Sequence, residues 1–263
     1  MNPAILLLGT IAPAANADSA PLETNVQPLS AFVAEDAPEP VKHKWTGSVA
    51  IGATYQTGNT DTRAVNASAE AQYRGEDDRW TATGYWNYGD TKDQVTNEYV
   101  LNARKAGLGL KYDYFLSKQL YAFANAGVQT DRLADIQRRD FIGAGVGYQW
   151  RETDTLKWGS EVGAGYFNES RYAGEDADYI SARAANNIDW KINDKSSLAN
   201  TLAAYPSLED SEDFFGRSDT RFKTSLTDAM FLQLQWVWDY DNTPSAGLDR
   251  NDHSITLGLG WSF

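Results

Sequence analysis

The sequence predicts a single all-β domain, a transmembrane antiparallel up-and-down β-barrel of about twelve strands. Three observations predict it: apolar and polar residues alternate along many segments, aromatic residues gather near the ends of those segments, and short connections alternate with longer ones. A tilted strand needs roughly 9 to 11 residues to cross a bilayer, with successive side chains on opposite faces. This combination is typical of barrels with a lipid-facing outer surface and a polar lumen.

The alternation is clearest in residues 255–263, which read ITLGLGWSF. Every second residue is apolar, the intervening ones are threonine, glycine or serine, and the chain stops on an aromatic residue. We expect this segment to close the barrel against the segment that starts at Trp45, whose Val49 and Ile51 would then point to the same outer face.

Twelve segments carry the pattern, and an even number allows both chain ends to lie on one side, which we expect to be the periplasm. They are residues 45–56, 65–73, 79–88, 98–112, 119–129, 140–150, 156–167, 178–190, 196–205, 217–226, 230–240 and 253–263. Tight links are expected at residues 75–78, 152–155 and 193–195. Longer, more polar loops are expected at residues 131–139, 168–177, 206–216 and 241–252.

The aromatic residues predict two belts at the membrane interfaces, where amphipathic rings are favoured. The belt at the tight turns would contain Trp45, Tyr73, Trp80, Tyr112, Tyr121, Trp150, Trp158, Trp190, Phe231, Trp261 and Phe263. The belt at the opposite ends would contain Tyr55, Trp86, Tyr88, Tyr99, Phe167, Tyr179, Tyr205, Trp238 and Tyr240.

One strand breaks register. Lys105 and Lys111 share a parity with the apolar residues that precede them, whereas the apolar residues from Ala106 onward have the opposite parity. A shift of one residue would keep the lysines away from lipid, and the sequence therefore predicts a β-bulge between Arg104 and Gly107.

Composition bounds the class of protein. The 263 residues can form one large barrel or two ordinary domains, and the mean hydropathy of −0.52 excludes a helical membrane protein but not a barrel, whose apolar residues alternate with polar ones. The absence of cysteine removes disulfides, thiolate catalysis and cysteine metal sites. A net charge of −13 disfavours nucleic acid as a partner, because phosphate binding needs a basic face.

The N-terminal part predicts export. Residues 1–17 contain a short apolar run and end in the small residues of a signal-peptidase site, although no lysine or arginine precedes the run. Residues 18–44 are rich in proline, alanine and acidic residues and are expected to form a disordered periplasmic linker, while residues 45–263 form the barrel. A periplasmic arm or a plug is the functional alternative for the linker.

Three motifs in this order resemble the YdiY-like family of salt-induced outer-membrane proteins, a domain family of unknown function. They are Trp45, Gly47 and Gly52 with residues 57–60 in WTGSVAIGATYQTGNT, then LKYDYFL at residues 110–116, then GWSF at residues 260–263. The resemblance covers about Trp45 to the end. It implies a Gram-negative outer-membrane barrel with a link to stress, and it supplies no catalytic, cofactor-binding or metal residues.

Charged residues on the predicted inner face are the candidates for function. They are Glu70, Arg104, Glu161, Arg183, Asp189, Asp219, Arg221 and Lys223. Rings of charge set the selectivity of pores, and Arg217, Asp219, Arg221 and Lys223 on one inward face would favour small anions. Alternatively, the charges pair across a narrow lumen and close it. A passive narrow pore for ions or small solutes and a plugged structural barrel of the envelope both remain open.

An outer-membrane hydrolase is a third, weaker alternative. The chain has two histidines, His43 in the linker and His253 at the edge of the last strand. A histidine that acts as the general base of a hydrolase needs a nucleophile and a carboxylate that orients its ring. Asp241 or Asp249 could supply the carboxylate. We assign no catalytic residue and expect no enzyme.

The acidic loops raise the question of divalent cations, but no calcium-loop spacing is present, and we expect neither a metal nor another cofactor. The acidic groups concerned are Glu209, Asp210, Glu212, Asp213, Asp239, Asp241 and Asp249. Expected partners are outer-membrane lipid, lipopolysaccharide and the barrel-assembly machinery, because Trp261 and Phe263 resemble the C-terminal assembly signal of outer-membrane barrels.

Overall fold

The computed structural model describes residues 44–56, 61–93, 96–133, 136–173, 176–209, 214–242 and 250–263. The predicted signal peptide and all of the predicted linker except Lys44 lie outside these ranges, so both stay predictions. Within the described ranges, no helix has both the length and the apolar composition to cross a bilayer.

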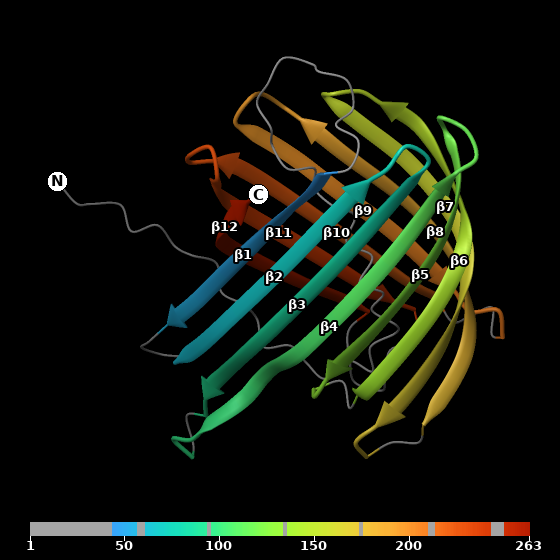
Figure 1. Ribbon diagram of the computed structural model, residues 1–263. Coiled ribbons are helices and arrows are strands. Elements are labelled where there is room, and N and C mark those ends of the chain that lie inside the picture. Colours follow the sequence, from blue (N-terminus) through green and yellow to red (C-terminus); the bar gives the residue numbers. More distant parts are fainter. Residues whose placement is uncertain are drawn as a thin grey trace.

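The described residues form a closed barrel of twelve antiparallel strands, as the sequence predicted (Figure 1). Each strand pairs with its neighbours in the chain, and β1 pairs with β12. The strands are β1 (Lys44–Gln56), β2 (Thr62–Arg74), β3 (Asp78–Lys92), β4 (Tyr99–Phe115), β5 (Leu120–Asp131), β6 (Ile136–Glu152), β7 (Leu156–Arg171), β8 (Ala177–Lys191), β9 (Ser196–Pro206), β10 (Phe214–Ser225), β11 (Met230–Asp241) and β12 (Asn251–Ser262).

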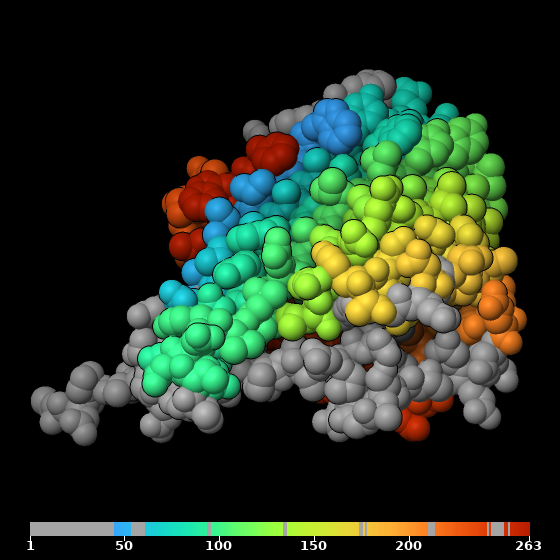
Figure 2. Space-filling model, turned by 90° about the horizontal axis from the view of Figure 1, so that it is seen from below, coloured from blue at the N-terminus to red at the C-terminus, as the bar shows by residue number. Residues whose placement is uncertain are grey.

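The last strand closes the barrel in the register expected from its alternation. Val49 lies opposite Trp261 and Ile51 lies opposite Leu259, so apolar residues of both strands share the outer face. Beyond the strand end, the amide of Gly47 donates to the carbonyl of Phe263 at 3.1 Å, and the amide of Phe263 donates back at 3.0 Å. In Figure 2 the last strand (red) accordingly lies beside β1 (blue).

Alternation separates the two faces of the wall. Val49 is 41% exposed and its neighbour Ala50 only 8%, because the first points out of the barrel and the second into it. Residues directly opposite one another in a ladder share a face, so the register carries this assignment from strand to strand.

The aromatic belts are only partly as predicted. Trp45, Trp80, Trp150, Trp158, Trp190 and Trp261 are exposed on the outer face, but Tyr121 and Phe231 are buried inside the barrel. At the other end Phe167 and Tyr205 are also buried, and Tyr179 stacks on Phe167 with ring centroids 5.1 Å apart. The side chain of Tyr55 lies outside the described part. The barrel interior needs bulky side chains to fill it, and some of the aromatic residues serve there.

The β-bulge exists but lies earlier than predicted. The β3–β4 ladder pairs Gly89 with Ala103 and Asp90 with Leu101, so Asn102 is the extra residue. The Asn102 amide donates to the Thr91 hydroxyl at 2.5 Å, which fixes the bulge. Downstream of it, Lys105 and Lys111 face inward as expected: they lie opposite Asn87 and Thr81.

The connections divide into a short-turn end and a long-loop end. The short-turn end carries residues 75–77, 116–119, 153–155, 192–195 and 226–229, and the other end carries residues 57–61, 93–98, 132–135, 172–176, 207–213 and 242–250. The predicted loops at 131–139 and 168–177 are too long, because β6 and β7 extend into them. The 17 residues of β6 project beyond the length needed for a bilayer.

Candidate functional site

The structure turns seven of the eight charged candidates into the lumen. Glu70, Glu161, Arg183 and Lys223 are buried there, and Asp189, Asp219 and Arg221 are partly exposed. Arg104 is the exception. It lies opposite Tyr88, which is on the outer face, and it is exposed. The prediction that Arg104 faces the lumen is therefore wrong. The bulge lies at Asn102, before Arg104 and not after it, and this shift of one residue turns Arg104 to the outer face.

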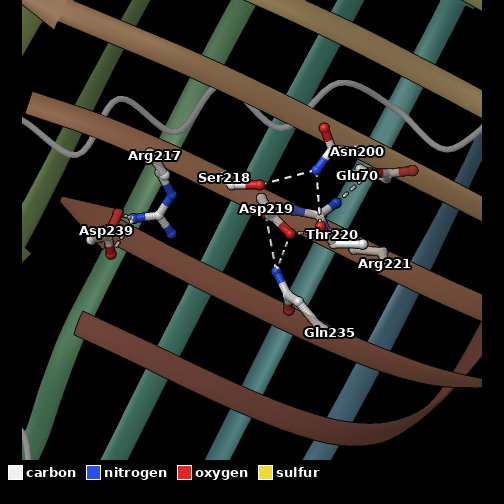
Figure 3. A network of polar contacts seen from close by, with 9 residues as sticks. All are labelled: Glu70, Asn200, Arg217, Ser218, Asp219, Thr220, Arg221, Gln235 and Asp239. Atoms are coloured by element: carbon white, nitrogen blue, oxygen red, sulfur yellow. Dashed lines mark hydrogen bonds and ion pairs between the residues drawn. The ribbon is translucent and has the colours of Figure 1, made fainter. Parts of the chain in front are cut away.

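Arg221 on β10 is the centre of the first polar cluster (Figure 3). Its guanidinium contacts the Asp219 carboxylate on the same strand face at 2.6 and 3.1 Å. The Gln235 amide of β11 also donates to both Asp219 oxygens, at 2.9 and 3.0 Å. Arg221 Nη1 lies 3.6 Å from Glu70 Oε2. Since β2 and β10 are not neighbours in the barrel, this last ion pair crosses the lumen.

Lys223 lies two residues further along the same face of β10. Its Nζ donates to the Ser48 hydroxyl of β1 at 3.3 Å and lies 4.5 Å from the centre of the Phe231 ring. Within the described part of the chain, no ion pair joins Lys223 to a carboxylate. Lys223 is thus a buried cation whose described partners are a hydroxyl and an aromatic face.

Arg217, the fourth member of the predicted basic cluster, lies apart from Arg221. It contacts both carboxylate oxygens of Asp239 on β11, at 2.9 and 3.0 Å. The four predicted residues therefore share one inward face, but two of their three cations are paired with carboxylates.

Glu161 on β7 is the centre of a second, fully buried cluster. It accepts hydrogen bonds from Lys111 Nζ at 2.6 Å, from the Tyr121 hydroxyl at 2.7 Å and from Arg183 Nη1 at 2.8 Å. These donors come from β4, β5 and β8. Three charge-assisted or strong hydrogen bonds compensate the cost of burying the carboxylate.

The second cluster extends to two residues that sequence reasoning missed. Asp113 contacts Lys111 at 2.8 Å and Arg79 at 2.6 Å, and its side chain is 1% exposed. A signal for both was available, because Arg79 and Asp113 each directly neighbour an outward aromatic residue in the sequence, and neighbours in a strand face opposite sides. Tyr121 was missed because it had been assigned to an interfacial belt.

A third cluster lies nearer the long-loop end. Arg139 on β6 pairs with Glu169 on β7, and Arg171 pairs with the same carboxylate at 3.0 Å. Arg139 and Glu169 are almost fully buried. The sequence predicts loops at both positions, but Arg139 and Glu169 continue the alternation of β6 and β7 and face inward.

The described side chains on the inner face carry a balance of charge opposite in sign to that of the whole chain. The described basic side chains on the inner face are Arg74, Arg79, Lys105, Lys111, Arg139, Lys157, Arg171, Arg183, Lys191, Arg217, Arg221 and Lys223. The acidic ones are Glu70, Asp113, Asp131, Glu152, Glu161, Glu169, Asp189, Asp219 and Asp239. The described side chains of the inner face are therefore basic on balance, although the whole chain has a net charge of −13. The side chains of Lys44, Asp241 and Asp252, whose strand positions also face inward, lie outside the described part.

The residues of the weaker alternatives do not come together in the described part. His253 lies on the outer face, where its ring stacks on Trp236 and its Nδ1 accepts from the Trp236 indole at 3.4 Å. His43 and Asp249 lie outside the described residues, as do Asp210, Glu212, Asp213 and the side chain of Asp241. Asp239 is paired with Arg217.

Comparison with known proteins agrees with the barrel. The chain is 22% identical over 239 residues to the uncharacterized protein YdiY of Escherichia coli (strain K12), covering 89% of each chain. It is similar in fold to the NanC porin, with a TM-score of 0.53 and 11% identity over 82% of this chain and 98% of the porin. An outer-membrane channel from Pseudomonas putida F1 aligns over 87% of this chain and 99% of its own, with a TM-score of 0.48 and 11% identity. The model of the family described as protein of unknown function, DUF481, matches residues 49–263, and the chain belongs to the DUF481 family.

Proposed function

We propose that the chain is an outer-membrane barrel that works as a narrow, passive pore with a preference for small anions. The observation that carries the proposal is the reversal of charge between the whole chain and the described side chains of its inner face. In a confined space with low-dielectric walls, an excess of fixed positive charge raises the local concentration of anions. Lys223 is the cation of this face of β10 that makes no ion pair among the described residues, and the carboxylates of Glu70 and Asp189 lie within electrostatic range of it.

The proposed pore is narrow because side chains of distant strands meet inside it. Lys111 of β4 reaches Glu161 of β7, and Arg221 of β10 reaches Glu70 of β2. The same contacts favour a second candidate function, a closed structural barrel of the envelope in which paired charges fill the lumen. Neither function needs a catalytic residue.

Conductance separates the two candidates. Folded protein in planar bilayers under a potassium chloride gradient should give discrete conductance steps, with a reversal potential of the sign expected for chloride. Heat-unfolded protein serves as the control. A cation-type reversal potential would contradict the anion preference, and the absence of steps from protein that is shown to be inserted would favour the closed barrel.

The proposed placement puts the short-turn end and both ends of the barrel domain at the periplasm. It has support from the short turns alternating with longer loops and from the exposed tryptophans at the short-turn end. Lipopolysaccharide would then contact the long-loop end, and the barrel-assembly machinery would recognise the last strand through Trp261 and Phe263. Protease added to intact cells should cut the long loops and spare the short turns.

A further inference from the structure

A polar patch on the outer face of the barrel belongs to none of the functions above. Asn200 of β9 and Ser218 and Thr220 of β10 form the patch. Asn200 lies opposite Thr220 in the ladder, which in turn lies opposite Trp236, an exposed residue of the outer face. All three side chains of the patch are partly exposed. They therefore point toward the bilayer and away from the lumen.

The patch lies at the depth where a barrel is normally most apolar. Thr220 is near the middle of β10, which runs from Phe214 to Ser225, and Asn200 is near the middle of β9, which runs from Ser196 to Pro206. At comparable positions the outward residues of most other strands are apolar, with Asn186 of β8, which donates to Ser160 of β7 at 3.0 Å, as a polar exception. Examples of the apolar ones are Ala69 of β2, Leu108 of β4, Ala124 of β5, Val162 of β7, Leu234 of β11 and Leu257 of β12.

The hydrogen bonds within the patch are incomplete. The Asn200 amide nitrogen donates to the Ser218 hydroxyl at 3.0 Å and to the Thr220 hydroxyl at 2.9 Å, and its amide oxygen points away from both (Figure 3). Among the described residues, none donates to that oxygen or accepts a proton from either hydroxyl. The patch thus presents one acceptor and two donors outward, in a medium that supplies no partners.

We propose that this patch is the contact surface between two copies of the chain in the membrane. An isologous contact places the patch against itself across a two-fold axis, so the Asn200 oxygen of each copy meets the hydroxyl donors of the other. On the long-loop side the small residues Ala204 and Gly216 border the patch, whereas Leu202, Trp236 and Trp238 lie directly opposite its members and give the contact an apolar rim.

Single-cysteine variants test the proposal without background, because the chain has no cysteine. Asn200→Cys, Ser218→Cys and Thr220→Cys are expressed one at a time, and isolated membranes are oxidised. Residues close to a two-fold axis meet their own copies, within the Cα separation that a disulfide needs. Ala69→Cys and Ala124→Cys, also outward and near mid-strand, are the matched controls. At least one patch variant should give about tenfold more covalent dimer than either control.

A second measurement does not depend on disulfide geometry. Light scattering of the wild type in mild detergent should give twice the mass of one chain, and Asn200→Leu with Thr220→Val should give the mass of one chain while keeping the heat-dependent gel mobility of a folded barrel. A monomeric wild type, equal crosslinking of patch and control variants, or crosslinking of the patch to a different protein would each overturn the proposal. Copurified lipopolysaccharide on a monomer would also overturn it.

Discussion

Lys111 of β4 and Glu161 of β7 meet inside the barrel with 2.6 Å between Nζ and Oε1, although two strands separate β4 from β7 along the wall. Both side chains are withdrawn from solvent, with exposed fractions of 7% and 0%. The pair links two parts of the inner wall that are three strands apart, and Arg183 and Tyr121 also donate hydrogen bonds to the carboxylate.

Neutralising that carboxylate should destabilise the barrel. Glu161→Gln leaves Arg183 and Lys111 buried with less compensating charge, at an expected cost of about 3 to 5 kcal/mol in the free energy of unfolding. Denaturant titration of protein folded into lipid vesicles measures it. Arg138→Ala is the control, because the Arg138–Asp140 pair is exposed and should contribute less than about 1 kcal/mol. Equal stability of wild type and Glu161→Gln would contradict the role assigned to the cluster.

Removing a lumen cation should change ion selectivity. Arg221→Ala leaves Asp219 and Glu70 without the guanidinium between them, so the reversal potential under a salt gradient should move toward that of a cation-preferring pore. Lys223→Gln should move it in the same direction. Arg138→Ala, on the outer face, should leave it unchanged. If both lumen variants conduct with wild-type selectivity, the anion preference does not come from this face of β10.

Position 147 should tolerate only glycine, because the ring of Tyr121 occupies the space beside it inside the barrel. A Cβ atom at Gly147 would overlap the ring of Tyr121, which donates to Glu161. Gly147→Val should therefore displace Tyr121 and cost about 1 to 3 kcal/mol in unfolding free energy. Gly216→Ala is the matched control, since the nearest atom to its added Cβ would be 3.5 Å away. A stable Gly147→Val protein with intact Tyr121 environment, read by near-ultraviolet circular dichroism, would show that the packing adjusts freely.

Deleting Phe263 should reduce insertion. The deletion removes both backbone hydrogen bonds between Phe263 and Gly47 and the aromatic terminus itself. Quantification of the protein in purified outer membranes should show a loss of most of the folded form, whereas Phe263→Tyr should retain it. Normal membrane levels of the truncated chain would argue against an assembly role for this residue.

The strand number, the closing pair and the faces of most strands could be predicted because alternation is a local property. The exact site of the bulge could not. The lysine at position 105 shows which residues face inward only from that position onward. The bulge lies at Asn102, whose side chain donates a hydrogen bond to Thr91 of the neighbouring strand, and the sequence does not show that contact. Arg104 was misplaced for that reason.

The sequence also could not predict which charged residues in the lumen pair with one another. Alternation predicts that Glu161 and Arg221 face inward, but it contains no information on which distant strand lies across the barrel. Only closure with a definite register brings Glu70 to Arg221 and Lys111 to Glu161. The inward position of Tyr121 follows from the same register, because an aromatic residue near a strand end suits either a membrane interface or a filled interior.

The closing ladder between β1 and β12 has a consequence for the entropy of folding. Every other strand pair is a hairpin formed from neighbouring parts of the chain, whereas this ladder joins Gly47 to Phe263, the two extremes of the barrel. Its paired register is also short, from Ser48 opposite Ser262 to Ile51 opposite Leu259. Contacts between residues far apart in sequence carry the largest loop-closure entropy. Of the twelve strand pairings, the β1–β12 ladder therefore has the largest closure entropy to offset, and it does so with few paired residues.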